Sequence, residues 1–337
     1  MIIENNIQLA QYTTFRIGGR ALYFCVVKNE DELVEAVGFS KKNKIPIFIL
    51  GGGSNILVSD NGFTGIVIKM EIMGKEYIEK AKENADEVKV IVGAGENWDS
   101  LVEETVEKKL YGLENLSYIP GTVGATPIQN IGAYGSEAKD TIESVYVLDI
   151  KKDEYKVIKN IDCDFSYRDS MFKKEKNRYV IISVTFILNK NGKLNLEYEG
   201  LKNIKNPSLK KVREAVIDIR KRKLPDIKEY GTAGSFFKNL IVSHSKAKEL
   251  LSLFPDMILH EVNDKKAKIP LAWILDHVCG FRGVRIGDVG IYKNQALVIV
   301  NYGNAKAEDI NNLAQKMSKA VYEKTGINIE PEVQFVV

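Results

Sequence analysis

The chain has 337 residues, of which 45% are hydrophobic and 28% charged, a composition typical of a soluble globular protein whose core needs no metal or disulfide. Its net charge of +3 argues against binding along a nucleic-acid backbone, although a local basic patch could still bind a diphosphate. Cys25, Cys163 and Cys279 have no CxxC spacing and the histidines form no HExxH pair, so we expect neither a disulfide framework nor a zinc site.

No export or membrane signal is expected either. Residues 1–10 lack the basic and then apolar layout of a signal peptide. The most apolar stretch, residues 179–188, is too short for a membrane helix. We therefore predict a reduced, cytoplasmic protein without membrane insertion.

Residues 1–70 are predicted to form an α/β unit. A helix begins after Asn29, which is suited to cap it together with Glu32. A strand at residues 45–50 leads into a glycine-rich turn, and residues 66–68 form another buried strand. Residues 75–87 are polar and poor in apolar side chains, so we expect a surface linker there.

The middle of the chain is rich in predicted strands. A strand at residues 88–92 and a helix at 98–106 come first. Four runs rich in β-branched and aromatic residues then follow one another with no helical pattern between them, which indicates neighbouring antiparallel strands. These runs are residues 145–150, 155–158, 179–188 and 194–198.

Helices and strands alternate in the last third. Apolar residues at helical spacing from Leu209 to Ile219 predict an amphipathic helix that ends before Pro225. Further helices are expected at residues 246–254, 271–278 and 308–324, with strands at 290–292, 296–300 and 327–337.

Two glycine-rich segments are candidate ligand loops. Residues 51–55 could present backbone N–H groups to an anion or simply form a tight turn, and the sequence leaves both interpretations open. Neither a Walker A loop nor a GxGxxG fingerprint is present. In residues 120–135, glycines and prolines alternate with apolar side chains, which favours an ordered loop against a flat or extended ligand over a disordered linker.

Several polar residues have both a functional and an ordinary interpretation. Ser235, beside two phenylalanines, is either a proton donor in a dry site or a turn residue. Arg168 is either a carboxylate clamp or one half of an ion pair with a neighbouring aspartate. Glu332 is either a solvated charge or a residue of a cleft. For the basic run at residues 220–223 we rank three interpretations: a solvated helix face comes first, a nucleotide site second and a nucleic-acid contact last.

Taken together, these segments resemble the UDP-N-acetylenolpyruvoylglucosamine reductases, a family of flavoenzymes of bacterial cell-wall precursor synthesis. The matching pieces keep the order of the family and cover nearly the whole chain. They are Asn5, Thr13-Thr14-Phe15-Arg16-Ile17-Gly18-Gly19, residues 50–59, residues 119–135, Tyr167-Arg168-Asp169-Ser170, Lys223-Leu224-Pro225-Asp226, residues 233–239, residues 273–301 and Glu330-Pro331-Glu332-Val333. Ile227 and Leu240 stand where prolines are usual, which leaves the geometry of those loops open.

The resemblance implies an α+β fold, namely a two-subdomain FAD-binding fold of the vanillyl-alcohol-oxidase/p-cresol-methylhydroxylase type plus an α+β substrate-binding domain. The first FAD-binding subdomain would span residues 1–70 and be completed by a C-terminal strand at 327–337. The second would span residues 71–208, and the substrate-binding domain residues 209–326.

The resemblance also implies non-covalent FAD, NADPH as co-substrate and a set of site residues. The cofactor-binding residues would be Gly51, Gly52, Gly53, Ser54, Asn55, Gly121, Thr122, Gly124, Ala125, Gln129, Asn130, Gly132, Ala133, Tyr134 and Gly135. The substrate-binding residues would be Tyr198, Arg220, Lys223 and Asn239, and the catalytic residues Ser235, Arg168 and Glu332. No metal is expected.

In the reaction of that family, flavin reduced by NADPH passes hydride to the CH₂ carbon of UDP-N-acetylglucosamine enolpyruvate. Arg168 would hold the substrate carboxylate, Glu332 would position or polarise it, and Ser235 would give a proton to the α-carbon, which yields UDP-N-acetylmuramate. A small-molecule substrate is thus expected, with no nucleic acid and no required protein partner. The alternatives are a flavin oxidase on the same fold and a nucleotide-binding module without chemistry.

Overall fold

The computed structural model describes residues 1–79 and 86–337. The chain divides into two compact units, each built from segments that are far apart in the sequence. One unit contains Met1–Ile7, Ala21–Gly53 and Phe63–Lys221, and the other contains Gln8–Arg20, Ser54–Gly62 and Arg222–Val337. The three-part division expected from the sequence stays a prediction.

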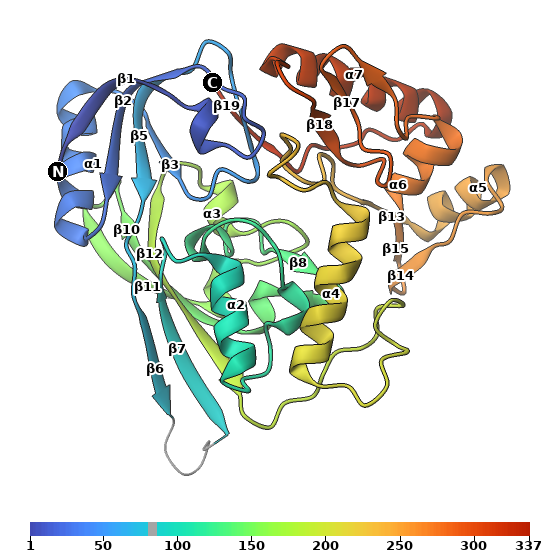
Figure 1. Ribbon diagram of the computed structural model, residues 1–337, viewed down its shortest axis with the longest axis horizontal. Coiled ribbons are helices and arrows are strands. Elements are labelled where there is room, and N and C mark those ends of the chain that lie inside the picture. Colours follow the sequence, from blue (N-terminus) through green and yellow to red (C-terminus); the bar gives the residue numbers. More distant parts are fainter. Residues whose placement is uncertain (80–85) are drawn as a thin grey trace. The chain divides into compact units, whose positions relative to one another are not determined.

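The first unit contains a four-stranded sheet in the order β1-β2-β5-β3 (Figure 1). Its strands are β1 (Ile3–Gln8), β2 (Arg20–Val27), β3 (Ile47–Leu50) and β5 (Phe63–Met70). Strands β2, β3 and β5 run parallel, so their carboxyl ends meet at one edge of the sheet. Helix α1 (Glu30–Asn43) connects β2 to β3, and the side chain of Asn29 caps it as expected by accepting from the N–H of Glu32 at 2.9 Å.

The first unit also contains an antiparallel five-stranded sheet in the order β11-β10-β12-β7-β6. Its strands are β6 (Lys75–Glu79), β7 (Glu87–Gly93), β10 (Ile142–Asp149), β11 (Glu154–Lys159) and β12 (Tyr179–Asn189). Helix α2 (Trp98–Glu107) lies beside this sheet (Figure 1), and its buried Trp98 meets Phe186 of β12 with ring centroids 5.9 Å apart.

Two expectations for this unit are wrong. The predicted linker at residues 75–87 contains strands β6 and the start of β7, and its residues 80–85 lie outside the described part of the chain. As an edge strand, β6 satisfies its backbone on β7 while its charged side chains face water, so it needs no apolar pattern. Residues 194–198 form no strand, because Leu194, Leu196 and Tyr198 pack against helix α4 (Leu209–Lys223) and not into a ladder.

The second unit contains two three-stranded sheets, β13-β15-β14 and β16-β17-β18, and a parallel pair, β19-β4. Its strands are β4 (Ile56–Val58), β13 (Leu240–Ser243), β14 (His260–Asn263), β15 (Lys266–Ile269), β16 (Arg285–Ile286), β17 (Val289–Ile291), β18 (Ile299–Asn301) and β19 (Gln334–Val336). Its helices are α5 (His244–Leu253), α6 (Leu271–Trp273), a π-helix at Ile274–Val278, and α7 (Ala307–Thr325).

Helix α7 covers the core of this second unit beside β17 and β18 (Figure 1). The predicted last strand is shortened to β19, because Pro331 has no N–H to donate to a ladder. Short elements complete the first unit, namely the hairpin β8 (Gly132–Ala133) and β9 (Ser136–Glu137), and helix α3 (Met171–Lys174). Within residues 1–79 and 86–337, no helix combines the length and hydrophobicity that crossing a membrane requires.

Candidate active site

The two glycine-rich segments lie against each other in the first unit. A Cβ added to Gly51, which follows β3, would stand 2.7 Å from Oγ1 of Thr122. A Cβ added to Gly52 would stand 2.6 Å from the Cα of Gly121. Only residues without a side chain allow two backbones to come this close. The segments therefore form one surface lined by backbone groups, the kind of surface that binds anions.

Backbone hydrogen bonds hold the second segment in place. The N–H of Trp98 donates to the carbonyl of Gly121 at 3.1 Å, and the N–H of Gly124 donates to Ala94 at 2.9 Å. A Cβ on Gly124 would lie 2.6 Å from the Cβ of Ala94, so this glycine also allows a close approach. The segment is an ordered loop and not a linker, as its composition predicts.

Asn130 braces this loop from the inside. Its side chain is fully buried, and its Nδ2 donates to Oε2 of Glu137 at 2.8 Å and to the carbonyl of Ser166 at 3.1 Å. Its Oδ1 accepts from the N–H of Lys139 at 3.0 Å. Because the side-chain amide of Asn130 is already hydrogen-bonded within the protein, we expect a ligand to contact the backbone of the loop and not this side chain.

The tip of the β8–β9 hairpin is held by a pair of asparagines. Tyr134 and Gly135 form the tip with φ angles of 50° and 87°, the left-handed geometry of tight hairpin turns. Nδ2 of the buried Asn115 donates to the carbonyls of Tyr134 at 2.7 Å and Asn195 at 2.9 Å. In return, Nδ2 of Asn195 donates to Gly135 at 2.9 Å. This pair ties the tip to the segment that carries Tyr198, and no sequence motif indicated it.

Two predicted substrate-binding residues gather at the same tip. The ring of Tyr198 meets that of Tyr134 edge-on, with centroids 4.8 Å apart. Arg220 of α4 hydrogen-bonds to Tyr134, and its Nε donates to the carbonyl of Tyr118 at 2.9 Å. Burial lowers the pKa of Arg220; burial also raises the pKa of Tyr134, an effect that Arg220 opposes. Lys223 lies one turn further along α4 on the same helix face.

Arg168 lies at the second glycine-rich segment. Its Nη2 donates to the carbonyl of Gly132 at 2.5 Å, and a Cβ on Gly132 would stand 2.9 Å from Nη1. The backbone of Arg168 has a φ of 55°, the left-handed region that few non-glycine residues adopt. Asp164 and Asp169, its suggested ion-pair partners, both pair with Lys174.

Ser235, Glu332 and Asn55 belong to the second unit, where backbone pairing joins their segments. The N–H of Phe236 donates to Leu297 at 2.8 Å, and its carbonyl accepts from the N–H of Glu332 at 2.8 Å. Nδ2 of Asn55 donates to the carbonyl of Glu332 at 3.2 Å. The structure thus brings Asn55, Glu332 and the segment of Ser235 together.

Asn239 has a structural contact in the same unit. Its Oδ1 accepts from the N–H of Leu271 at 3.2 Å, at the first residue of α6. This contact fixes the start of α6 against the strand that begins at Leu240. The predicted contact of Asn239 with a substrate stays a prediction.

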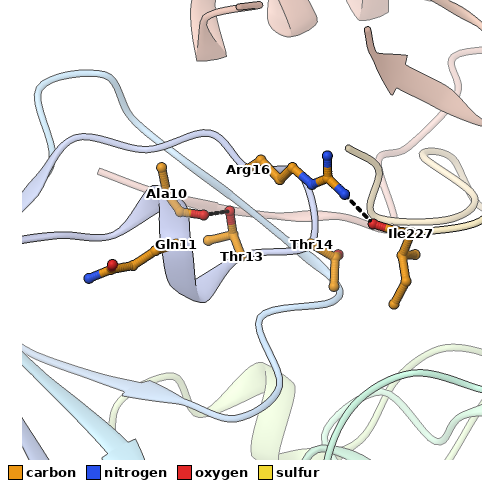
Figure 2. Close-up of a pocket in the computed structure, with 6 residues that line it drawn as sticks. All are labelled: Ala10, Gln11, Thr13, Thr14, Arg16 and Ile227. Carbon is orange, nitrogen blue, oxygen red and sulfur yellow. Dashed lines mark hydrogen bonds between the residues drawn. The ribbon is translucent and has the colours of Figure 1, made fainter. Parts of the chain in front are cut away.

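A pocket of about 520 Å³ in the second unit contains none of the predicted site residues (Figure 2). It is lined by Ala10, Gln11, Thr13, Thr14, Arg16 and Ile227. The guanidinium of Arg16 donates to the carbonyl of Ile227 at 2.7 Å, and Oγ1 of Thr14 donates to Thr232 at 2.6 Å. These groups join the N-terminal motif to the segment that leads to Ser235, so we interpret the pocket as structural.

The sheets of this chain have the fold of the vanillyl-alcohol-oxidase-type flavoproteins. Residues 21–156 match the model of an FAD binding domain. A vanillyl-alcohol-oxidase-type flavoprotein from Myceliophthora thermophila superposes with a TM-score of 0.52 at 12% identity, over 94% of this chain and 73% of that one. The two segments suit an anionic cofactor, because a Cβ at Gly51 or Gly52 would collide with Thr122 or Gly121 and disrupt the surface that their backbone groups line. The predicted fold class is confirmed.

Residues 226–336 match the C-terminal domain of UDP-N-acetylenolpyruvoylglucosamine reductase. The reductase of that name from Flavobacterium johnsoniae is 44% identical over 100% of both chains, and that of Ralstonia nicotianae is 40% identical over 98% of both. The crystal structure of the Thermus caldophilus reductase covers 100% of both chains with a TM-score of 0.71 at 25% identity. The chain belongs to this family and is an FAD-dependent oxidoreductase, which confirms the resemblance.

Proposed function

We propose that this chain uses NADPH and FAD to reduce UDP-N-acetylglucosamine enolpyruvate to UDP-N-acetylmuramate, a step of peptidoglycan precursor synthesis. The observation that carries the proposal is the 44% identity, over the full length of both chains, to a reductase named for this substrate. The gathering of Tyr134, Tyr198 and Arg220 in the first unit supports it. We further propose a cytoplasmic enzyme that needs no protein partner.

FAD would be held without a covalent bond. Its binding residues would be the glycines and neighbours of residues 51–55 and 121–135 that the resemblance assigns. When bound, the flavin supplies hydride transfer, from NADPH to the CH₂ carbon of the enolpyruvyl group. The substrate's UDP-sugar would be bound by Tyr198, Arg220, Lys223 and Asn239.

Arg168 and Glu332 would act on the carboxylate of the substrate. Negative charge develops next to this carboxylate as hydride arrives, and a guanidinium can hold it with two parallel hydrogen bonds. The contact of Arg168 with Gly132 fixes the guanidinium in one orientation. Both backbone polar groups of Glu332 are also hydrogen-bonded, to Phe236 and Asn55, which fixes the origin of its side chain.

Ser235 would complete the reduction by giving its hydroxyl proton to the α-carbon. The balance is one hydride to the CH₂ carbon and one proton to the α-carbon, so the enolpyruvyl double bond becomes the saturated lactyl ether. Phe236 and Phe237, next in the chain, are almost fully buried. A proton donor next to a buried apolar segment would favour direct proton transfer if the bound substrate excludes water from it.

Stopped-flow absorbance of the Ser235→Ala variant tests the proposal. We expect NADPH to reduce the flavin at the wild-type rate, and reoxidation by the enolpyruvyl UDP-sugar to slow by about two to four decades. Ser252→Ala is the control, because Ser252 is an exposed serine of α5 whose hydroxyl donates to the helix carbonyl of Lys248 at 3.1 Å. Reoxidation of Ser235→Ala at the wild-type rate would exclude Ser235 as the proton donor. Reduced wild-type enzyme that reacts with oxygen and ignores the sugar would indicate an oxidase.

A further inference from the structure

Lys69 is a charged residue in an apolar stretch of β5, and the proposed reaction does not use it. It lies in register with Val26 of β2 and with Leu50 of β3, the residue that precedes Gly51. Its side chain is partly buried. The carboxyl ends of parallel strands are where such sheets bind ligands, and Lys69 lies at this edge.

The ammonium of Lys69 is bonded to the first glycine-rich segment. Its Nζ donates to the carbonyl of Gly51 at 2.6 Å. Burial lowers the pKa of Lys69, and the charge of Glu71 opposes this effect. Among residues 1–79 and 86–337, no carboxylate lies within ion-pair distance of Lys69. Burying part of a cation without such a partner is unfavourable, unless hydrogen bonds to the loop or an anion bound there offset the cost.

The bond to Gly51 determines where the next N–H points. A trans peptide is planar, with its C=O and N–H directed to opposite sides. Because Lys69 holds the carbonyl of Gly51, the N–H of Gly52 is directed away from Lys69. In the described part of the chain this N–H has no hydrogen-bond acceptor, although Gly52 is itself partly buried. An unused backbone donor among glycines is suited to an anion.

We propose that Lys69 is a positioning residue of the cofactor site, which fixes the Gly51–Gly52 peptide so that the N–H of Gly52 binds the diphosphate of FAD. This inference rests on the proposed placement of FAD at the glycine-rich loops. The positive charge also draws electrons from the peptide through its carbonyl, which makes the N–H a stronger donor. Lys69 thereby acts on the diphosphate through Gly52.

FAD titrations of the apoprotein, followed by fluorescence quenching, test this role. Lys69→Met keeps the apolar stem and removes the ammonium, and should raise the Kd for FAD about 10- to 100-fold, as expected for a hydrogen bond to a charged group. Lys69→Arg keeps a charged donor and should restore the Kd to within about threefold of wild type. The thermal unfolding midpoint of the Lys69→Met apoprotein should not fall, because methionine suits this surrounding.

Lys89→Met is the matched control, since Lys89 lies on β7 and pairs with Glu143 at 2.8 Å. Its Kd for FAD should equal that of wild type. The inference is overturned if Lys69→Met binds FAD as wild type does, or if Lys69→Arg loses as much affinity as Lys69→Met. A wild-type apoprotein that fails to bind FAD would refute the proposed function first, which distinguishes the two failures.

Discussion

Replacing Gly52 with alanine should separate the two glycine-rich segments. Carbon atoms in contact lie about 3.5–4.0 Å apart, whereas the new Cβ would stand 2.6 Å from the Cα of Gly121. The obstacle is backbone and not the end of a flexible side chain, so the loops have to move by roughly 1 Å. Overpacking of this kind costs about 1–3 kcal/mol. If this cost falls on cofactor binding, the affinity for FAD drops about 5- to 150-fold.

The assay is a titration of apoprotein with FAD, together with thermal unfolding of the apoprotein and holoprotein. Gly38→Ala is the control, because Gly38 lies in helix α1 and a Cβ there meets nothing within 4 Å. This variant should bind FAD normally and be up to about 1 kcal/mol more stable. If Gly52→Ala binds FAD like wild type and unfolds at the same temperature, the result would contradict the claim that Gly52 and Gly121 are too close to admit a Cβ.

Three further predictions concern the surroundings of the site and the sheet. Arg168→Lys removes the two-pronged donor and should lower kcat/KM for the enolpyruvyl sugar about 100-fold or more while NADPH still reduces the flavin; unchanged kcat/KM would refute the clamp. Asn115→Ala removes two buried hydrogen bonds and should lower the free energy of unfolding in urea by about 1–3 kcal/mol; no loss would show that the brace is unimportant. Burial alone would raise the pKa of Asp149, but hydrogen bonds from Arg178 and Lys156 outweigh it and hold that pKa at about 2. The stability that this lowered pKa contributes is present above about pH 4 and is lost as the pH falls toward 2. Asp149→Asn should therefore flatten that part of a plot of unfolding free energy against pH. An unchanged slope would contradict the pairing of Asp149 with Arg178 and Lys156.

The sequence predicted those elements whose signals are local. Helices α1, α4 and α7 were expected because apolar residues recur at helical spacing, and the cap at Asn29 was readable from its neighbours. The polar edge strands β1 and β6 escape prediction from sequence, because an edge strand can be polar on both faces. Strand β2 lies inside the sheet and is largely apolar, and no element was predicted there from the sequence. Residues 194–198 have the alternating apolar pattern of a strand, but their apolar side chains pack on helix α4 and the segment forms no strand.

The candidate site likewise contains features that a local sequence pattern indicates and features that only the fold creates. Composition alone favours a ligand loop at residues 120–135 and leaves a ligand loop and a tight turn equally open at residues 51–55. The binding of FAD by these segments stays a prediction. The contact of Gly52 with Gly121 was not predictable, since it joins segments that no local pattern relates. Lys69 and Asn115 were missed because each acts on backbone carbonyls of another segment. Such bonds depend on the fold and leave no motif in the sequence.

The most direct test of the proposed function is an anaerobic absorbance trace of the purified wild-type protein, to which NADPH and then UDP-N-acetylglucosamine enolpyruvate are added. We predict a yellow flavin that bleaches with NADPH and regains its colour only when the enolpyruvyl sugar is added. A reduced flavin that the sugar does not reoxidise would contradict the proposed substrate, and a protein that stays colourless after FAD is supplied would contradict the flavin site itself.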